Sequence, residues 1–290
     1  MSGGWTHQMQ SEKYLKSIFV GERFSVFKRN VWGACLYFNH RLGKWNFPFI
    51  AEYFTSHKEP EIKSERGIKI VFWDKPMEQN YTTNKIDRQN GWLQAKWMFS
   101  QSRPPTAYID LTDLNISNYF EGWGHTLKNH RNKWLSQIER ENIKLVKVSV
   151  SEFYDYYSKS SLKKRLRKFY GKQMFDFEKS YGEDIYFYLI YNGVDEVVAG
   201  TCIVDDFETK QSIYQYVFTD KSNKYKYIGV GIIDLCIRHT FEKGFHFLNL
   251  TAVWEKGQPS SWKGLSKFKD QFNPIISRCH NTYVKFAIKI

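Results

Sequence analysis

The chain has 290 residues, of which 42% are hydrophobic and 18% aromatic. This length suits one large domain or two compact ones, and the apolar content excludes a disordered chain, which has too little apolar surface to offset chain entropy. The formal net charge is +13, and residues 128–172 alone contain 13 Lys or Arg against 4 Asp or Glu. A basic surface of this kind attracts the phosphates of nucleic acids, nucleotides or lipids, although helices that only face solvent also carry such charges.

The sequence contains no segment typical of export or membrane insertion. Seven charged residues interrupt the first thirty positions, and no run of about 18 apolar residues occurs. We therefore expect a soluble cytoplasmic protein, for which peripheral contact with the inner membrane surface remains an option.

The four cysteines predict neither a metal site nor a disulfide framework. They are Cys35, Cys202, Cys236 and Cys279, and none forms a C-x-x-C pair. Cys202 and Cys236 lie in apolar periodic segments, where a buried free thiol is common. We expect structural cysteines and no bound metal.

The first hundred residues carry few clear signals. Residues 66–73 (RGIKIVFW) predict a strand and residues 84–99 a helix. The prolines in residues 103–106 predict a rigid linker, because each fixes its own backbone and restrains the preceding residue. Residues 107–111 predict a short strand.

A clearer pattern follows. Thr112 or Asp113 can cap a helix that runs towards Arg140. Apolar alternation then predicts strands at 143–148, 185–191, 197–204, 212–218, 245–250 and 283–288, the first of them half-buried. Helical spacing predicts helices from Ser151 towards Tyr181, from Ile228 to Lys243 and from Ser260 to Phe272.

The local turn signals agree with this division. Asn192-Gly193 is typical of a hairpin, and Gly244 of a helix end. From residue 143 the order is β-α-α-β-β-β-α-β-α-β, which is the element order of the GNAT (acyl-CoA N-acyltransferase) fold. We therefore predict an α/β protein with a mixed sheet and a GNAT fold.

The junction before the helix at 228–243 is a candidate phosphate site. Lys226, Gly229 and Gly231 resemble the GNAT signature Q/R-x-x-G-x-G/A, with lysine in the basic position. Glycines let a backbone approach a ligand, and the amides of a helix N-terminus attract a pyrophosphate. The alternative is a simple turn before a helix.

Gly264, Leu265, Phe268, Lys269 and Phe272 form a G-(hydrophobic)-x-x-F-K-x-x-F pattern. This pattern resembles a motif of the FemABX aminoacyltransferase family, and two further segments resemble the same family. Residues 103–111 resemble its "QP-x-x-T…DL" segment, with arginine in place of glutamine. Residues 128–131, which include Lys128 and Arg131, resemble its basic "K-x-R" helix. The resemblance covers about residues 90–273.

The resemblance implies tandem GNAT-like domains, here a short divergent one at 1–112 and a second at 113–290. It implies aminoacyl-tRNA as donor, a nucleotide- or lipid-linked peptidoglycan precursor as acceptor, no tightly bound cofactor and no DNA partner. Phe268 would then stack near the terminal adenosine, and Lys269 would stabilise the oxyanion formed at the ester carbonyl. On the helix, Leu265, Phe268 and Phe272 would face the core and turn Lys269 towards the donor groove. The alternative is a solvated lysine beside a core phenylalanine.

A basic stretch with interleaved aromatic residues is a candidate surface for phosphates or tRNA. It contains Lys163, Lys164, Arg167 and Lys172, with Lys128 and Arg131 upstream. Phosphates attract such charges without sequence preference, and aromatic rings can stack on bases. The pyrophosphate of a precursor and the stem of a tRNA remain equal alternatives.

Two weaker candidates are Asp205-Asp206, expected in a loop, and His239, expected as a packed residue rather than a base. Three functions remain open. A FemABX-like transferase is favoured over an acyl-CoA-dependent N-acyltransferase acting on a sugar amine or small molecule. The third is a catalytically silent module that binds RNA or an anionic surface.

Overall fold

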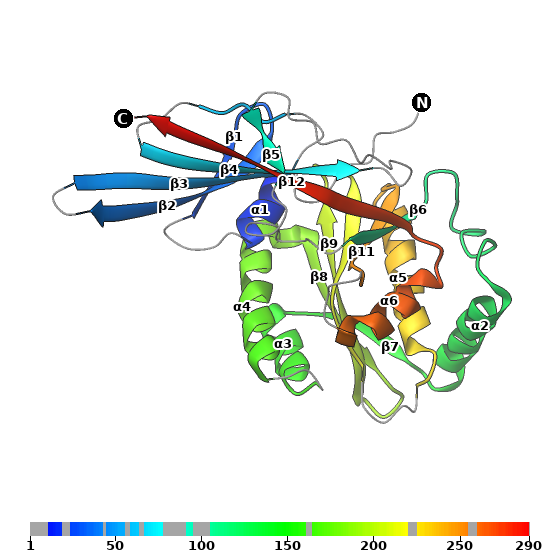
Figure 1. The fold of residues 1–290 in the computed structure, drawn as a ribbon. Helices are drawn as coiled ribbons and strands as arrows, with labels where there is room; N and C mark the ends of the chain where they lie inside the picture. The colour runs from blue at the N-terminus through cyan, green and yellow to red at the C-terminus, as the bar shows by residue number, and fades with distance from the viewer. Residues whose placement is uncertain are drawn as a thin grey trace. The chain divides into compact units, whose positions relative to one another are not determined.

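A computed structural model of the chain describes residues 11–18, 24–42, 45–55, 59–63, 67–77, 91–94, 105–160, 164–219, 225–254 and 260–289. The chain divides into two compact units, each with its own set of strands (Figure 1). Unit 1 comprises residues 1–105 and 276–290, and unit 2 comprises residues 106–275.

Unit 2 is built on six strands in the order β6-β11-β10-β9-β8-β7. Their bounds are β6 Thr106–Asp110, β7 Lys144–Val148, β8 Ile185–Tyr191, β9 Val197–Asp206, β10 Gln211–Thr219 and β11 Phe247–Ala252. All neighbours are antiparallel except β10 and β11, which are parallel. The predicted hairpin joins β8 to β9, and Asn192 Oδ1 accepts the amide N–H groups of Val194 and Glu196 at 3.1 and 2.8 Å.

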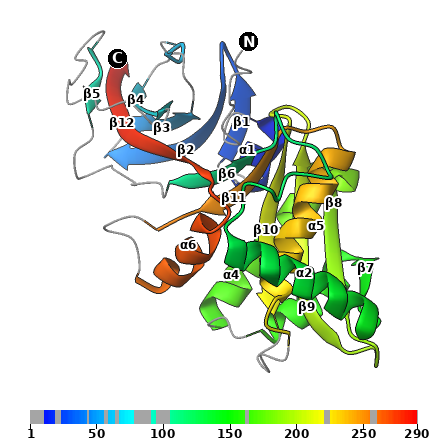
Figure 2. The same cartoon turned by 90° about the vertical axis from the view of Figure 1, so that its right-hand side faces the viewer.

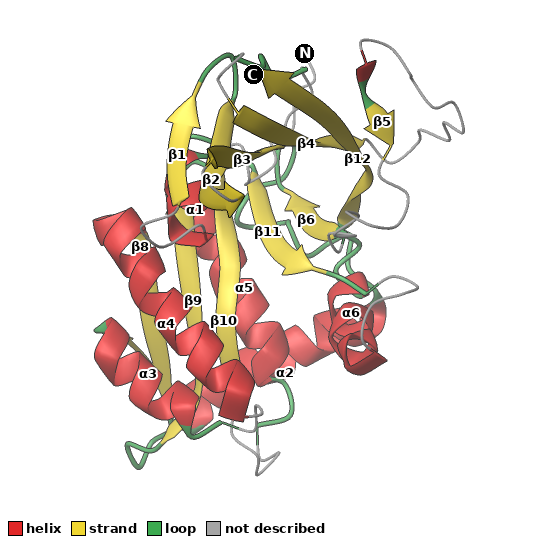
Figure 3. Cartoon of the chain, turned by 60° about the vertical axis from the view of Figure 1, so that its left-hand side comes forward, coloured by secondary structure: helices red, strands yellow, loops and turns green. Residues whose placement is uncertain are grey.

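Helices cover both sides of this sheet. Their bounds are α2 His125–Arg140, α3 Val150–Ser158, α4 Lys164–Tyr181, α5 Ile228–Glu242 and α6 Lys263–Asp270, with short 3₁₀ turns η3 Gly182–Asp184 and η4 Ser260–Trp262. Figure 3 shows α3 and α4 on one side of β8–β10 and α5 on the other, with α2 against α5 (Figure 2). The core is accordingly double: Phe153 and Phe177 are fully buried under α3 and α4, and Ile232 and Ile237 under α5.

The element order predicted from residue 143 onward is confirmed in the structure, with three local differences. The helix predicted to begin at Ser151 begins at Val150, and Ser149 caps it, because its side chain accepts the amide N–H of Glu152 at 3.2 Å. The predicted strand at 143–148 is not half-buried, since every residue of β7 but Val148 is exposed. Asp205 and Asp206 end strand β9 and do not lie in a loop.

The helix expected to begin at Thr112 or Asp113 begins only at His125. The Thr112 hydroxyl donates to Asp110 Oδ1 at 2.6 Å, and the chain then makes successive turns, such as that from Leu111 O to the Leu114 amide. Short polar side chains compete with a helical backbone in this way, and residues 112–124 are rich in them. The predicted end of the helix at Arg140 is confirmed.

Unit 1 contains strands β1-β2-β3-β4-β12 in spatial order, with β5 also paired to β12. Their bounds are β1 Phe24–Lys28, β2 Trp32–Leu42, β3 Trp45–Thr55, β4 Gly67–Met77, β5 Leu93–Gln94 and β12 Ile275–Lys289, and one helix, α1 Glu12–Ile18, contacts β1 and β2. Among the strand pairs that the structure describes in unit 1, only β3 and β4 run parallel. A buried ion-pair network joins Arg29 and Lys69 to Glu52, with N···O distances of 2.6 and 2.9 Å.

Two expectations about unit 1 differ from the structure. Residues 93–94 of the helix predicted at 84–99 form a strand, and most of its other residues lie outside the described ranges. The last predicted strand, 283–288, was expected in a domain of residues 113–290, but β12 pairs with β4 and belongs to unit 1. Its alternating apolar residues match those of β4, for example Val284 opposite Phe72. Among the described residues, no helix has the length and apolarity needed to cross a bilayer.

Candidate active site at the end of β11

The sheet of unit 2 opens between β10 and β11. Their parallel pairing begins at Gln211 and Phe247 and ends at Ile213 and Asn249, although β10 continues to Thr219. Both strands are irregular beyond this point. β10 has an extra residue relative to β9 between Tyr214 and Val217, and β11 has one relative to β6 between Asn249 and Ala252. Bulges of this kind redirect side chains and end strand pairing, and they are common beside active sites.

Lys269 lies at the end of β11. It is carried by α6, which Figure 2 shows beside β11, and its side chain is only 1% exposed. Its ammonium donates to the carbonyl oxygen of Ala252 at 2.7 Å and to Thr251 Oγ1 at 3.3 Å. Within the described ranges, no carboxylate pairs with it. Burial lowers the pKa of Lys269 from 10.5 to about 7.

The orientation of α6 differs from the prediction. Lys269 and Ser266 face the protein interior, whereas Leu265 is 50% exposed. The Ser266 hydroxyl accepts the amide N–H of Trp254, which fixes this side of the helix against the segment after β11. The expected apolar stripe is therefore wrong at Leu265, and the lysine points into the protein rather than across its surface.

Phe268 on α6 packs against the start of α5. An added Cβ on Gly229 would lie 3.4 Å from Phe268 Cζ, so the ring lies against the first helical turn of α5. Phe268 also makes an edge contact with Phe272, which in turn contacts Trp123, with ring centroids 5.3 and 5.2 Å apart. The structure thus brings Phe268 and Gly229 together, with Lys269 next to Phe268 on α6.

Gly231 has a packing role. An added Cβ would overlap the indole ring of Trp134 on α2, so this glycine lets α2 and α5 pack closely. Its amide donates to the carbonyl oxygen of Tyr227 at 3.1 Å. Gly231 is therefore covered by α2, which contradicts its prediction as an open phosphate cradle. Lys226, just before α5, is exposed.

Arg131 is buried and does not face a surface where a phosphate could bind. Its guanidinium pairs with Asp234 on α5 and lies 4.1 Å from the centroid of the Phe120 ring. Asp234 also accepts from Tyr119 and Arg238, and the pKa of Tyr119 is raised to about 12, chiefly by burial. Arg131 therefore ties α2 to α5, which corrects its prediction as a phosphate ligand.

The other basic candidates remain predictions. Lys128 on α2 is half-buried and Lys172 on α4 is exposed. Lys164 and Arg167 belong to the first turns of α4, but their side chains lie outside what the structure describes, and Lys163 lies wholly outside it.

The sequence did not predict that a buried polar cluster forms at the other half of α5. Asp205 is fully buried, and His239 Nε2 lies 2.9 and 3.0 Å from its two oxygens. Ser212 donates to Asp205 at 2.8 Å, and Lys243 Nζ lies 3.6 Å from it. His239 is thus a packed residue, as expected. The Asp205 partners are 7 to 38 residues away in sequence, so no local signal links them.

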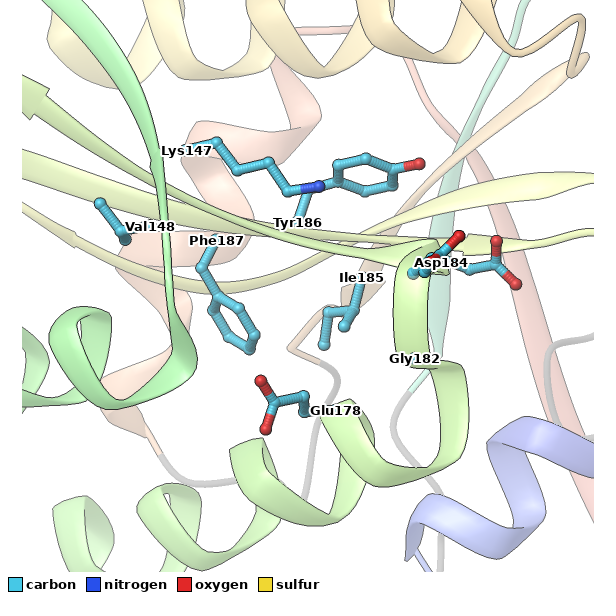
Figure 4. A pocket seen from close by; sticks show the side chains of 9 residues that line it. Lys147, Val148, Glu178, Gly182, Asp184, Ile185, Tyr186 and Phe187 are labelled. Carbon is cyan, nitrogen blue, oxygen red and sulfur yellow. The ribbon is translucent and has the colours of Figure 1, made fainter.

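A separate cavity of about 510 Å³ lies where β7 ends beside β8. Figure 4 shows Lys147 lying along Tyr186 on one side of the sheet, with Ile185, Phe187 and Glu178 on the other. The Lys147 ammonium is 4.4 Å from the centroid of the Tyr186 ring. None of the predicted site residues lines this cavity, and acidic side chains make up much of its polar lining.

The comparisons with known proteins concern the fold. No protein-family model matches the sequence, and no curated protein matches it. The solved structure of FemX is similar with a TM-score of 0.62 and 10% sequence identity, over 95% of this chain and 91% of FemX. A conserved protein of unknown function from Bacteroides thetaiotaomicron is similar with a TM-score of 0.51 and 11% identity, over 97% of this chain and 90% of that one.

The predicted fold class is confirmed by this likeness. The chain is an α/β protein with mixed strand directions, the element order predicted for a GNAT fold and a fold similar to that of FemX. At 10% identity the likeness concerns the fold, and the activity has to be argued from the site.

Proposed function

We propose that this protein is an acyltransferase that moves an aminoacyl group from aminoacyl-tRNA to an amine of a nucleotide- or lipid-linked cell-wall precursor. The observation that carries the proposal is Lys269, a buried cation held by two neutral oxygens and, in the described part of the chain, by no carboxylate. A buried charge without a counterion is costly, and such groups are concentrated at functional sites.

Two hydrogen bonds orient the buried ammonium of Lys269. An ammonium has three donors, and Thr251 and Ala252 accept two of them. Among the described residues none accepts the third donor, and we assign it to the developing oxyanion. When an amine attacks an ester carbonyl, negative charge accumulates on the carbonyl oxygen. A preorganised cation stabilises that charge more strongly in the transition state than in the ground state.

The position of Phe268 favours aminoacyl-tRNA over acyl-CoA as the donor. Its ring lies against Gly229 in the first turn of α5, where the acyl-CoA alternative needs space for a pyrophosphate. A partly exposed aromatic ring in the same place offers a stacking surface for a terminal base. The covered position of Gly231 points in the same direction.

A single-turnover assay with purified protein tests the proposal. Aminoacyl-tRNA and acyl-CoA are offered separately, each with a uridine nucleotide-linked or lipid-linked pentapeptide. Transfer from the charged tRNA, together with no CoA binding by calorimetry, is the expected result. CoA binding with acyl transfer would instead establish the N-acyltransferase alternative. RNA binding without transfer from either donor would establish the silent binding module.

A further inference from the structure

The strand that ends beside Lys269 contains an unusual backbone position. Thr251 has φ +63, in the left-handed region. Of the five non-glycine residues with positive φ in the described ranges, it is the only β-branched one. The left-handed conformation is sterically unfavourable for such a residue, and it persists where surrounding contacts hold it.

Asn249 supplies the contact that holds Thr251. The fully buried Asn249 accepts the amide N–H of Thr251 through Oδ1 at 2.7 Å. Its own Nδ2 donates to Gln211 Oε1 at 3.0 Å, which anchors the carboxamide to β10. Asn249 is also the last residue of β11 that pairs with β10, and the bulge in β11 begins directly after it.

The bulge places two oxygens on one side of the chain. Thr251 Oγ1 and the carbonyl oxygen of Ala252 both accept from the Lys269 ammonium, at 3.3 and 2.7 Å. In a regular strand, the Thr251 side chain would stand perpendicular to the sheet and the carbonyl of Ala252 would lie in its plane, so the two oxygens would not converge on one point. The left-handed residue makes this convergence possible.

We infer that Thr251 and Asn249 are positioning residues for Lys269: Asn249 fixes the left-handed turn at Thr251, and the turn presents two acceptors that orient the ammonium so that its third N–H faces the reacting carbonyl. The inference rests on the proposed function for the identity of the reaction. The hydrogen-bond arrangement itself can be tested without any activity.

The test compares Thr251→Val with Thr251→Ser. Valine keeps the β-branched shape and the backbone strain but removes the hydroxyl, whereas serine keeps the hydroxyl. The first readout is the pKa of Lys269, followed through its ¹³Cε resonance, which is assigned by its absence from the spectrum of Lys269→Met. Losing one acceptor disfavours the charged form, so Thr251→Val should lower this pKa by about one unit, while Thr251→Ser should preserve it.

The second readout is single-turnover transfer at pH 7. Thr251→Val should reduce kcat about 10-fold with little change in KM, and Thr251→Ser should restore most of it. An unchanged Lys269 pKa in Thr251→Val, or a serine variant as impaired as the valine variant, would overturn the inference. If the wild type transfers no aminoacyl group, the proposed function fails, and the resonance of Lys269 still decides whether Thr251 positions it.

Discussion

Lys269 is almost completely buried, with 1% of its surface exposed. Its pKa of about 7 lies below the ordinary value of 10.5 because burial disfavours the ammonium. Above pH 10.5 the lysine is neutral in both the folded and the unfolded chain. As the pH falls from 10.5 to 7, the unfolded chain binds a proton that the folded chain does not, so the free energy of unfolding decreases over this window.

Lys269→Met should therefore stabilise the protein at neutral pH and lose this advantage at alkaline pH. Methionine has a similar length and carries no charge. The stability gain at pH 7 should exceed that at pH 10 by about 3–4 kcal/mol, as the difference between the two pKa values implies. Urea unfolding of both proteins across this range measures it. A gain that does not depend on pH would show that Lys269 is not a desolvated cation.

At the scale of elements, close packing of α2 against α5 determines the geometry behind the site. Arg131 and Trp134 on α2 contact Asp234 and Gly231 on α5. Arginine and glycine are also the residue types found at phosphate-binding sites, so the sequence alone predicted such a role for Arg131 and Gly231. Their packing roles became visible only with the partner helix in place, since Arg131 and Asp234 are 103 residues apart.

Substitutions at the two glycines of α5 should have opposite effects. Gly231→Ala should cost about 1–3 kcal/mol of stability, because its methyl group would overlap the Trp134 indole. Gly229→Ala meets only Phe268 at ordinary contact distance and should gain up to about 1 kcal/mol from the better helix propensity of alanine. Thermal unfolding of the two variants checks this. Equal stability changes would contradict the packing role of Gly231.

Helix α6 illustrates what local patterning can and cannot predict. The F-K pair and the helix at 260–272 follow from the sequence, and the structure has both. The direction of Lys269 does not follow, because Leu265, Phe268 and Phe272 alone suggest a different buried face. The inward direction depends on Trp254 and Ala252, which meet Ser266 and Lys269 through hydrogen bonds from a neighbouring segment.

At the scale of the whole molecule, alternation and helical spacing were sufficient for the order of elements in unit 2, because each element buries its own periodic face. The sequence did not predict which distant strands pair with each other. β12 follows α6 directly in sequence, yet it pairs with β4 about two hundred residues earlier. The sequence did not predict the Asp205 cluster for the same reason, since β9, β10 and α5 all contribute residues to it.

The excess positive charge should determine how RNA binding responds to salt. Reversing Lys163, Lys164 and Arg167 to Glu should reduce the slope of log K against log salt for tRNA binding by about 2–3. Each phosphate contact that is lost means that about one counterion fewer is released on binding. Lys179→Glu, at the other end of α4, serves as a control for a general change of charge. A slope that is the same in the triple variant and the wild type would mean that the start of α4 only faces solvent.

The most direct test of the catalytic role of Lys269 compares Lys269→Met with Lys267→Met in single-turnover transfer from charged tRNA. Lys267 lies on the same helix but is exposed, so it controls for loss of positive charge on α6. We expect Lys269→Met to lower kcat about 10²–10³-fold with little change in KM, since the ammonium acts mainly on the transition state, whereas Lys267→Met should transfer at nearly the wild-type rate. Wild-type transfer by Lys269→Met, or an equal loss in both variants, would contradict it.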